Sequence, residues 1–364
     1  MTRRERFERA MRHEEVDRIP FWVKVFGQSY RMLQPKKWRE MGELELADYL
    51  DLDHYAGCPA PVVCDNERIT HSVERGETRM VERWETFDGA LELVRGWDAS
   101  SASWHPTEFP IRTVEDIPAA VQVFAGNQWR HEPSLAERAR ERIRQVGDRG
   151  LVHCGIGISP LMQLIQHWIG PQQTYFFLQD HPAEMEELIG EMHAERLRFL
   201  DAALEDCPAQ WLTSVENTST TLLSPEIFER YCFEHLRDYG TKIREAGRHH
   251  MLHQCGQLHD LLPKIDELPA ECIEAYTAPT LGDTTVADRN ERAPSMAIIG
   301  GTQAPTWLLP VDEICAIIER DLREAGSIRG VVLTSAGVMP PYCGIEKIKQ
   351  IRERMYDIKW DSVA

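Results

Sequence analysis

The sequence is short of positive charge. It holds 41 Lys and Arg residues against 59 Asp and Glu residues, which gives a formal net charge of -18 at pH 7. Nonspecific binding to phosphate backbones needs a concentrated basic surface, but the arginine-rich pieces TRRER and ERARERIRQ alternate basic with acidic residues. The composition therefore argues against a general nucleic-acid-binding protein.

The sequence also lacks the features of a membrane or secreted protein. No apolar run approaches the roughly 20 residues that span a bilayer. The N-terminal stretch MTRRERFERAMRHEE has no apolar core and predicts an amphipathic helix rather than a signal peptide. The 9 cysteines show no disulfide framework, which is typical of reduced thiols. We expect a cytoplasmic protein without a membrane partner.

Short apolar runs alternate with segments of helical periodicity, and no GxGxxG or Walker loop follows the first run. The runs lie near 18–25, 150–157, 211–220, 249–256, 272–279, 296–303 and 331–338. Apolar strands buried on both faces indicate a parallel sheet. About eight such units in a chain of this length predict a (β/α)8 TIM barrel, with a doubly wound sheet as the alternative. No linker or repeat divides the chain, so we take 1–364 as a single domain.

The stretch 76–110 departs from this pattern. It has alternating residues, DG and RG turns and three tryptophans. It predicts a β-hairpin insertion near the barrel mouth.

Polar residues gather where the apolar runs end, which is the functional face of a barrel. Glu216 follows the run WLTSV, where an unpaired carboxylate is costly to bury, so a partner or a reaction is implied. A capping or ion-pair role explains Glu216 equally well. Asn217, Tyr276 and Ser335 are candidates for substrate binding, and Glu216 and His253 are candidates for catalysis.

His253 and Cys255 end the stretch HHMLHQCG two residues apart. Alternate residues of a strand share a face, so an imidazole and a thiolate would lie side by side. Zinc accepts nitrogen, sulfur and oxygen ligands, and Glu274 on the next run could add an oxygen. The plain alternative is a hydrogen-bonded core histidine, a small buried cysteine and a glutamate that balances an arginine.

Four segments carry a resemblance that runs nearly end to end: TRRERFERAMRHEEVDRIPFW, ENTSTTLLSPEIFERY, the HxCG motif and the strand ending in IIGGT. They resemble the uroporphyrinogen decarboxylase superfamily. The resemblance implies a (β/α)8 barrel with its site at the C-terminal mouth. It also implies one of two activities, either porphyrinogen decarboxylation or methyl transfer between a corrinoid, or a methylated small molecule, and a thiol or tetrahydrofolate acceptor.

The decarboxylase branch has an RQAGR segment after the first strand and a GHG at the last one. Here those stretches read Lys24-Val25-Phe26-Gly27-Gln28 and Ser335-Ala336-Gly337. A substrate with many carboxylates needs fixed cationic donors. The resemblance therefore favours the methyltransferase branch, and a decarboxylase-type lyase is the alternative.

Thiol-methylating members of that branch hold zinc with an HxC pair and a later cysteine. His253 and Cys255 match the pair, whereas Val338 stands where the later cysteine is expected. Cys343 and Glu274 would complete the set. The metal would hold a substrate thiol as thiolate. With a folate acceptor, Glu216 would bind or protonate a ring nitrogen.

The resemblance also bears on partners. No DxHxxG cobalamin-binding signature is present, so the resemblance implies a corrinoid carried by a separate protein, beside a small-molecule substrate. The sequence leaves open whether the protein forms a homodimer. A non-catalytic binding protein on the same barrel is the remaining alternative.

Overall fold

A curled parallel sheet forms the centre of the protein, whose structure, a computed structural model, describes residues 1–358. The sheet has seven strands in the order β1-β8-β9-β10-β11-β12-β13, and every pair within it is parallel. The strands are β1 (His54–Cys58), β8 (Gly150–Gly157), β9 (Trp211–Val215), β10 (His249–His253), β11 (Cys272–Thr277), β12 (Ala297–Thr302) and β13 (Val331–Leu333).

The extended segment around Phe21 joins the two edges of this sheet. Trp22 N–H donates to the carbonyl of Leu333 on β13 at 3.0 Å, and Asp53 N–H, just before β1, donates to the carbonyl of Phe21 at 2.9 Å. Phe21 also forms an isolated parallel bridge with Leu333. The run expected as a strand near 18–25 therefore pairs only briefly.

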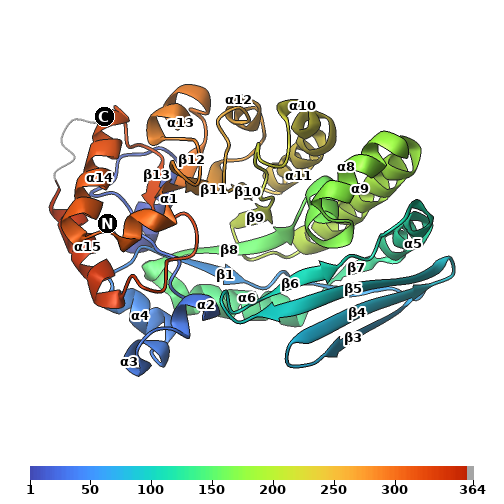
Figure 1. The fold of residues 1–364 in the computed structure, drawn as a ribbon. Coiled ribbons are helices and arrows are strands. Elements are labelled where there is room, and N and C mark those ends of the chain that lie inside the picture. Colours follow the sequence, from blue (N-terminus) through green and yellow to red (C-terminus); the bar gives the residue numbers. More distant parts are fainter. Residues whose placement is uncertain (359–364) are drawn as a thin grey trace.

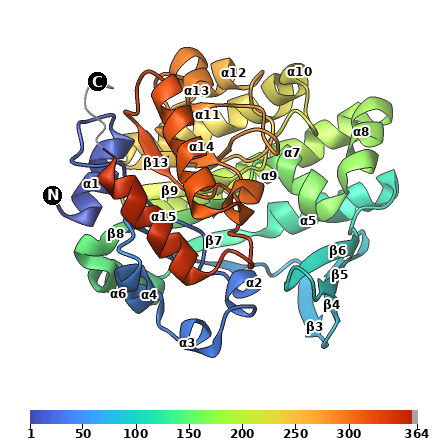
Figure 2. The same ribbon diagram turned by 60° about the vertical axis from the view of Figure 1, so that its left-hand side comes forward.

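Helices cover the outer face of the curl (Figures 1 and 2). The α-helices are α1 (Arg3–Met11), α2 (Gln28–Arg31), α3 (Lys36–Arg39), α4 (Glu43–Tyr49), α5 (Ile117–Gly126), α6 (Pro133–Val146), α7 (Pro160–Gln163), α8 (Pro171–Asp180), α9 (Pro182–Leu204), α10 (Pro225–Phe228), α11 (Glu234–Glu245), α12 (Leu262–Asp266), α13 (Val286–Arg292), α14 (Val311–Glu324) and α15 (Ile345–Asp357). Short 3₁₀ turns are η1 (Val114–Asp116), η2 (Gly147–Arg149) and η5 (Ala304–Leu308), and π-helical turns are η3 (Leu164–Trp168) and η4 (Glu229–Phe233). None of the helices within residues 1–358 is long and apolar enough to cross a membrane.

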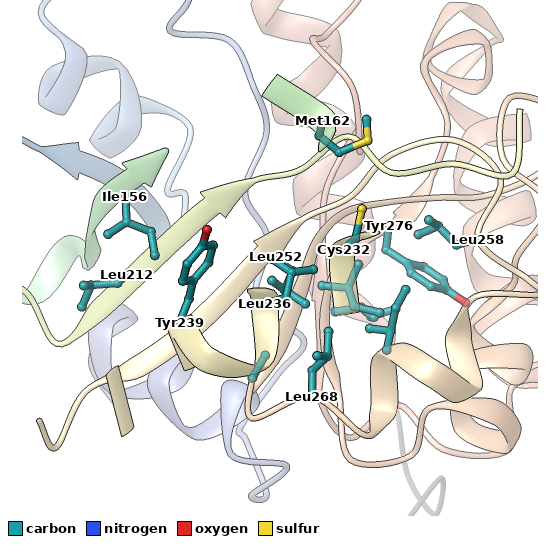
Figure 3. Packing of buried hydrophobic residues seen from close by; sticks show 14 of the residues in the cluster. Ile156, Met162, Leu212, Cys232, Leu236, Tyr239, Leu252, Leu258, Leu268 and Tyr276 are labelled. Atoms are coloured by element: carbon teal, nitrogen blue, oxygen red, sulfur yellow. The ribbon is translucent and has the colours of Figure 1, made fainter. Parts of the chain in front are cut away.

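Two apolar layers hold the curl together. One layer lies between strands and helices, where Leu212 and Leu252 pack with Leu236 and Tyr239 of α11 (Figure 3). The other contains at least one side chain from each strand of the sheet and also Phe7 and Met11 of α1. Side chains of all seven strands can meet in one cluster only if the sheet curls around it. The second layer is therefore the interior of the curled sheet, and α1 closes one end of it.

Residues 70–108 form a separate four-stranded antiparallel sheet rather than one hairpin. Its strands follow the chain in the order β3 (Thr70–Arg75), β4 (Arg79–Thr86), β5 (Gly89–Asp98) and β6 (Ser103–Glu108). The expected hairpin over 76–110 misses β3 because every residue of that strand is exposed, so no apolar alternation marks it. A two-stranded sheet of β2 (Val62–Asp65) and β7 (Gln128–His131) completes the fold.

Candidate functional site

A layer of polar side chains lies directly above the apolar interior. Side chains alternate along a strand, so a residue two positions after an interior apolar residue also faces the interior. Moving two positions on from Trp22, Leu151, Trp211, Met251, Cys272 and Val332 of the interior cluster gives Lys24, His153, Thr213, His253, Glu274 and Thr334. Because parallel strands run the same way, this polar layer lies toward their carboxyl ends.

Glu274 is the centre of the polar layer. Its side chain is 4% exposed, and Lys24 Nζ lies 2.7 Å from its Oε1. Its other oxygen, Oε2, pairs with Nδ1 of His253. Burial would raise the pKa of Glu274, but the Lys24 charge and the bond to His253 lower that pKa to about 2. Burial would lower the pKa of His253, but hydrogen bonds with Cys255 and Glu274 raise it to about 9. At neutral pH Glu274 and His253 are therefore both charged.

His153 is the neutral imidazole of the same layer. Its ring stacks on Tyr55 with centroids 4.2 Å apart, and its Nδ1 is hydrogen-bonded to Thr213 Oγ1 at 2.9 Å. Burial lowers its pKa to about 4. His153 can therefore bridge polar atoms at neutral pH without adding charge.

Asn217 connects this layer to the loop after β9. The Cys255 thiol donates to Asn217 Oδ1 at 3.5 Å, and Asn217 Nδ2 donates to Gln166 Oε1 at 2.9 Å. The backbone amides of Glu216 and Asn217 both donate to the carbonyl of His253 at 3.0 Å. Three of the predicted site residues, Asn217, His253 and Cys255, are thus brought together.

Glu216 is fully buried, and the hydrogen bonds of its carboxyl group go to Ser159. It accepts hydrogen bonds from Ser159 N–H at 3.1 and 3.2 Å and from the Ser159 hydroxyl. Ser159 precedes α7, so the carboxyl group holds the start of that helix. Burial raises the pKa of Glu216 to about 7, although the bonds from Ser159 oppose the rise. These contacts correspond to the helix-capping role that the sequence analysis gave as one alternative for Glu216.

A β-bulge moves Tyr276 out of the polar layer. Alternation from Cys272 and Glu274 would place Tyr276 in the interior, but the β11–β12 register shifts after Glu274 and Ala275 has φ +65°. Tyr276 instead lies in the apolar layer between strands and helices (Figure 3). Its hydroxyl donates to the carbonyl of Thr285 at 2.8 Å.

The other two predicted residues lie after β13. The Ser335 hydroxyl donates to the carbonyl of Gly337 at 2.8 Å and so closes its own turn. Cys343 is fully buried in the outer apolar layer, and its carbonyl accepts a bond from the Tyr30 hydroxyl at 2.7 Å. Burial raises the pKa of the Cys343 thiol to about 11.

These positions do not fit a zinc ion held by His253, Cys255, Glu274 and Cys343. The Cys343 thiol is enclosed in the core, and a Lys24 ammonium already lies on Glu274. Within residues 1–358 no group of three or more His, Cys, Asp or Glu side chains is arranged to hold a metal.

Three residues of the layer, Lys24, Thr213 and Thr334, were not predicted as site residues. Lys24 and Thr213 lie in short apolar runs without a motif, and Thr334 follows the last run. Thr334 Oγ1 is buried and has no hydrogen-bond partner within residues 1–358. Counting two positions on from each interior apolar residue would have identified all three.

Comparison with known proteins identifies the family to which the chain belongs. The family model described as "Uroporphyrinogen decarboxylase (URO-D)" matches residues 139–357, more than half of the chain. The chain belongs to the uroporphyrinogen decarboxylase family. The match includes His253, Cys255 and Glu274, and it begins after Lys24. No curated protein matches the sequence significantly.

Solved structures extend the likeness in fold beyond the matched residues of this uroporphyrinogen decarboxylase family member. A methyltransferase from Methanosarcina mazei is 15% identical, with a TM-score of 0.58 over 98% of this chain and 98% of that one. A protein from Listeria monocytogenes, provisionally named a vitamin-B12-independent methionine synthase, is 15% identical, with a TM-score of 0.40 over 95% and 98% of the two chains. At these identities the first similarity shows a shared fold, and the second is too distant to add to it.

Proposed function

We propose that this protein is a methyltransferase of the uroporphyrinogen decarboxylase family. It would move a methyl group between a corrinoid, or a methylated small molecule, and a thiol or tetrahydrofolate acceptor. The observation that carries the proposal is the charged group Lys24–Glu274–His253 in the polar layer. The fold likeness to a methyltransferase along nearly the whole chain supports it.

The same group argues against decarboxylation of a porphyrinogen. Binding several carboxylates needs several unpaired cations. Lys24 is the one lysine or arginine in the polar layer, and Glu274 already neutralises it at 2.7 Å. His253 then carries the remaining positive charge, which suits one developing negative charge better than many fixed ones.

In this proposal His253 acts as a general acid. When the donor is a methylated small molecule, the bond from carbon to its heteroatom breaks while the acceptor's lone pair forms a new bond to that carbon. The electron pair of the broken bond stays on the heteroatom, which then needs a proton. Because its pKa is about 9, His253 holds that proton at neutral pH and can supply it. Solvent afterwards returns a proton to the imidazole.

Glu216 and Asn217 are positioning residues in this proposal. Their amides fix the carbonyl of His253, and Asn217 also orients Cys255. The corrinoid would bind at the carboxyl ends of the strands, presented by a separate protein. The β3–β6 sheet would form a wall near the mouth of a complete (β/α)8 barrel, a placement supported by the 5.0 Å contact between the rings of Trp84 and Trp168.

Spectrophotometry of cobalamin tests the proposal. The protein is mixed with methylcobalamin and a panel of small thiols or tetrahydrofolate, and in the opposite direction with reduced cobalamin and methyl ethers, thioethers or amines. We expect methyl exchange with at least one pair, and a roughly 10²- to 10⁴-fold slower reaction with His253→Ala. Exchange absent throughout, together with turnover of uroporphyrinogen, would establish the lyase alternative.

A further inference from the structure

Lys24 occupies the side of Glu274 that a bound metal would need. Its Nζ lies 2.7 Å from Glu274 Oε1, while Nδ1 of His253 takes Oε2. Both oxygens of this nearly buried carboxylate are therefore committed to cationic groups. A metal ion would have to displace one of them.

The Lys24 ammonium is also tethered near this position. The backbone of Lys24 is fixed by Met339 N–H, which donates to its carbonyl at 3.2 Å. The ammonium lies 6.0 Å from the ring centroid of Trp22, and the side chain is only 19% exposed. A lysine side chain enclosed to this extent cannot rotate freely into solvent and break its ion pair with Glu274.

We propose that Lys24 is a built-in cation that replaces a metal ion and keeps divalent metals off His253, Cys255 and Glu274. Asn217 links His253 and Cys255, because its amide donates to the carbonyl of His253 and its Oδ1 accepts from the Cys255 thiol, and Glu274 contacts His253. His253, Cys255 and Glu274 carry nitrogen, sulfur and oxygen donors of the kind that zinc binds, but with Lys24 in place they are not arranged as a metal site. A fixed positive charge beside the carboxylate repels a second cation in a poorly solvated interior.

Having Lys24 rather than a metal ion beside Glu274 determines which substrate atoms the site can bind. A metal would bind a neutral or anionic donor atom directly, whereas Lys24 and His253 offer only N–H donors and charge. The site therefore selects a substrate atom that accepts hydrogen bonds and does not require direct coordination. This inference does not rest on methyl transfer, because metal binding is measured without turnover.

Cobalt(II) binding provides the test, since cobalt bound to a thiolate absorbs strongly and takes the same ligands as zinc. The wild-type chain, reduced and freed of metal, is titrated with cobalt(II) alone and then with zinc. We expect no thiolate band and substoichiometric zinc. Lys24→Met is expected to bind about one cobalt per chain, at least about 100-fold more tightly than wild type, and to lose the band when Cys255→Ser is added.

Three further variants make the result specific. Lys24→Arg keeps the charge and is expected to exclude cobalt, whereas Lys24→Gln is expected to admit it. Lys242→Met removes a lysine paired with Asp201 on the surface and should behave as wild type. Thermal melts identify any unfolded variant, and the wild-type titration stands even if every Lys24 variant unfolds. Stoichiometric zinc bound through Cys255 in the wild type, or a folded Lys24→Gln that binds no more cobalt than wild type, would overturn the proposal.

Discussion

Two buried glutamates have opposite pKa shifts, although Glu216 directly follows the apolar strand β9 and Glu274 lies within the apolar strand β11. Burial raises the pKa of Glu216 to about 7, because its partners on Ser159 are neutral. Burial acts on Glu274 too, but Lys24 and His253 lower its pKa to about 2. The difference lies in the charge of the partners, which no local sequence pattern specifies.

Glu216 makes the protein less stable as the pH rises. Its pKa in the folded chain, about 7, is above the unfolded value of 4.5, so its contribution is fully present below pH 4.5 and is lost as the pH rises through 7. We expect wild type to lose about 3 kcal/mol relative to Glu216→Gln across this window. Urea unfolding of both proteins at pH 5, 6, 7 and 8 measures the difference, and parallel curves would show that Glu216 is ionised when buried.

Glu274 should determine the protonation of His253. In wild type the His253 pKa of about 9 lies above its usual 6.5, so this pair stabilises the fold below pH 6.5 and the contribution is lost as the pH rises through 9. Glu274→Gln removes the carboxylate, and we expect the His253 pKa to fall by about 1 to 3 units. Nitrogen-15 NMR titration of the imidazole measures this value. An unchanged titration would place the cause elsewhere.

At the scale of elements, the apolar runs predicted most of the sheet. Four of them match β8, β10, β11 and β12 closely, whereas the run expected to 220 ends with β9 at Val215, because Asn217 adopts φ +54°. Strand β1 was missed, since its sequence HYAGC is short and has no β-branched residue. Helical periodicity located α9, where Met185, Leu188, Ile189 and Met192 form one buried face.

The bulge in β11 explains why the site was predicted only in part. His253 and Glu274 came together because the order of neighbouring strands can be predicted from the sequence, whereas Cys255 and Asn217 follow the ends of β10 and β9 and contact each other there. Tyr276 did not join them because the extra residue of the bulge reverses the alternation, and nothing in CIEAYT marks it. Lys24 was passed over because its partner lies on a strand about 250 residues later in the sequence, and a contact across that distance depends on closure of the curl.

Gly300 on β12 should be required for this bulge. A Cβ at Gly300 would lie 2.1 Å from the carbonyl oxygen of Tyr276, which is backbone and cannot rotate away. We expect Gly300→Ala to destabilise the fold by about 3 kcal/mol or more. Gly190→Ala is the matched control, because nothing lies within 4 Å of that position on α9, and it should gain up to about 1 kcal/mol. Equal unfolding midpoints for the two variants would contradict the packing described.

For the whole molecule, α1 links the beginning of the chain to the interior of the sheet. Phe7 is fully buried and stacks on Tyr55 with centroids 5.9 Å apart. We expect Phe7→Ala to cost about 3 to 5 kcal/mol. Phe87→Ala removes a ring that is 94% exposed and should cost less than about 0.5 kcal/mol. Denaturant unfolding of both variants makes the comparison, and a small loss for Phe7→Ala would mean that the interior is closed without α1.

The most direct measurement compares methyl exchange by wild type, His253→Ala and Glu216→Gln, using cobalamin absorbance and a substrate pair found active. If the polar layer is the reaction centre, His253→Ala loses roughly 10²-fold or more, whereas Glu216→Gln, which keeps an acceptor for Ser159, loses less than about tenfold. A large loss in Glu216→Gln with little loss in His253→Ala would place the chemistry outside the layer and contradict the account.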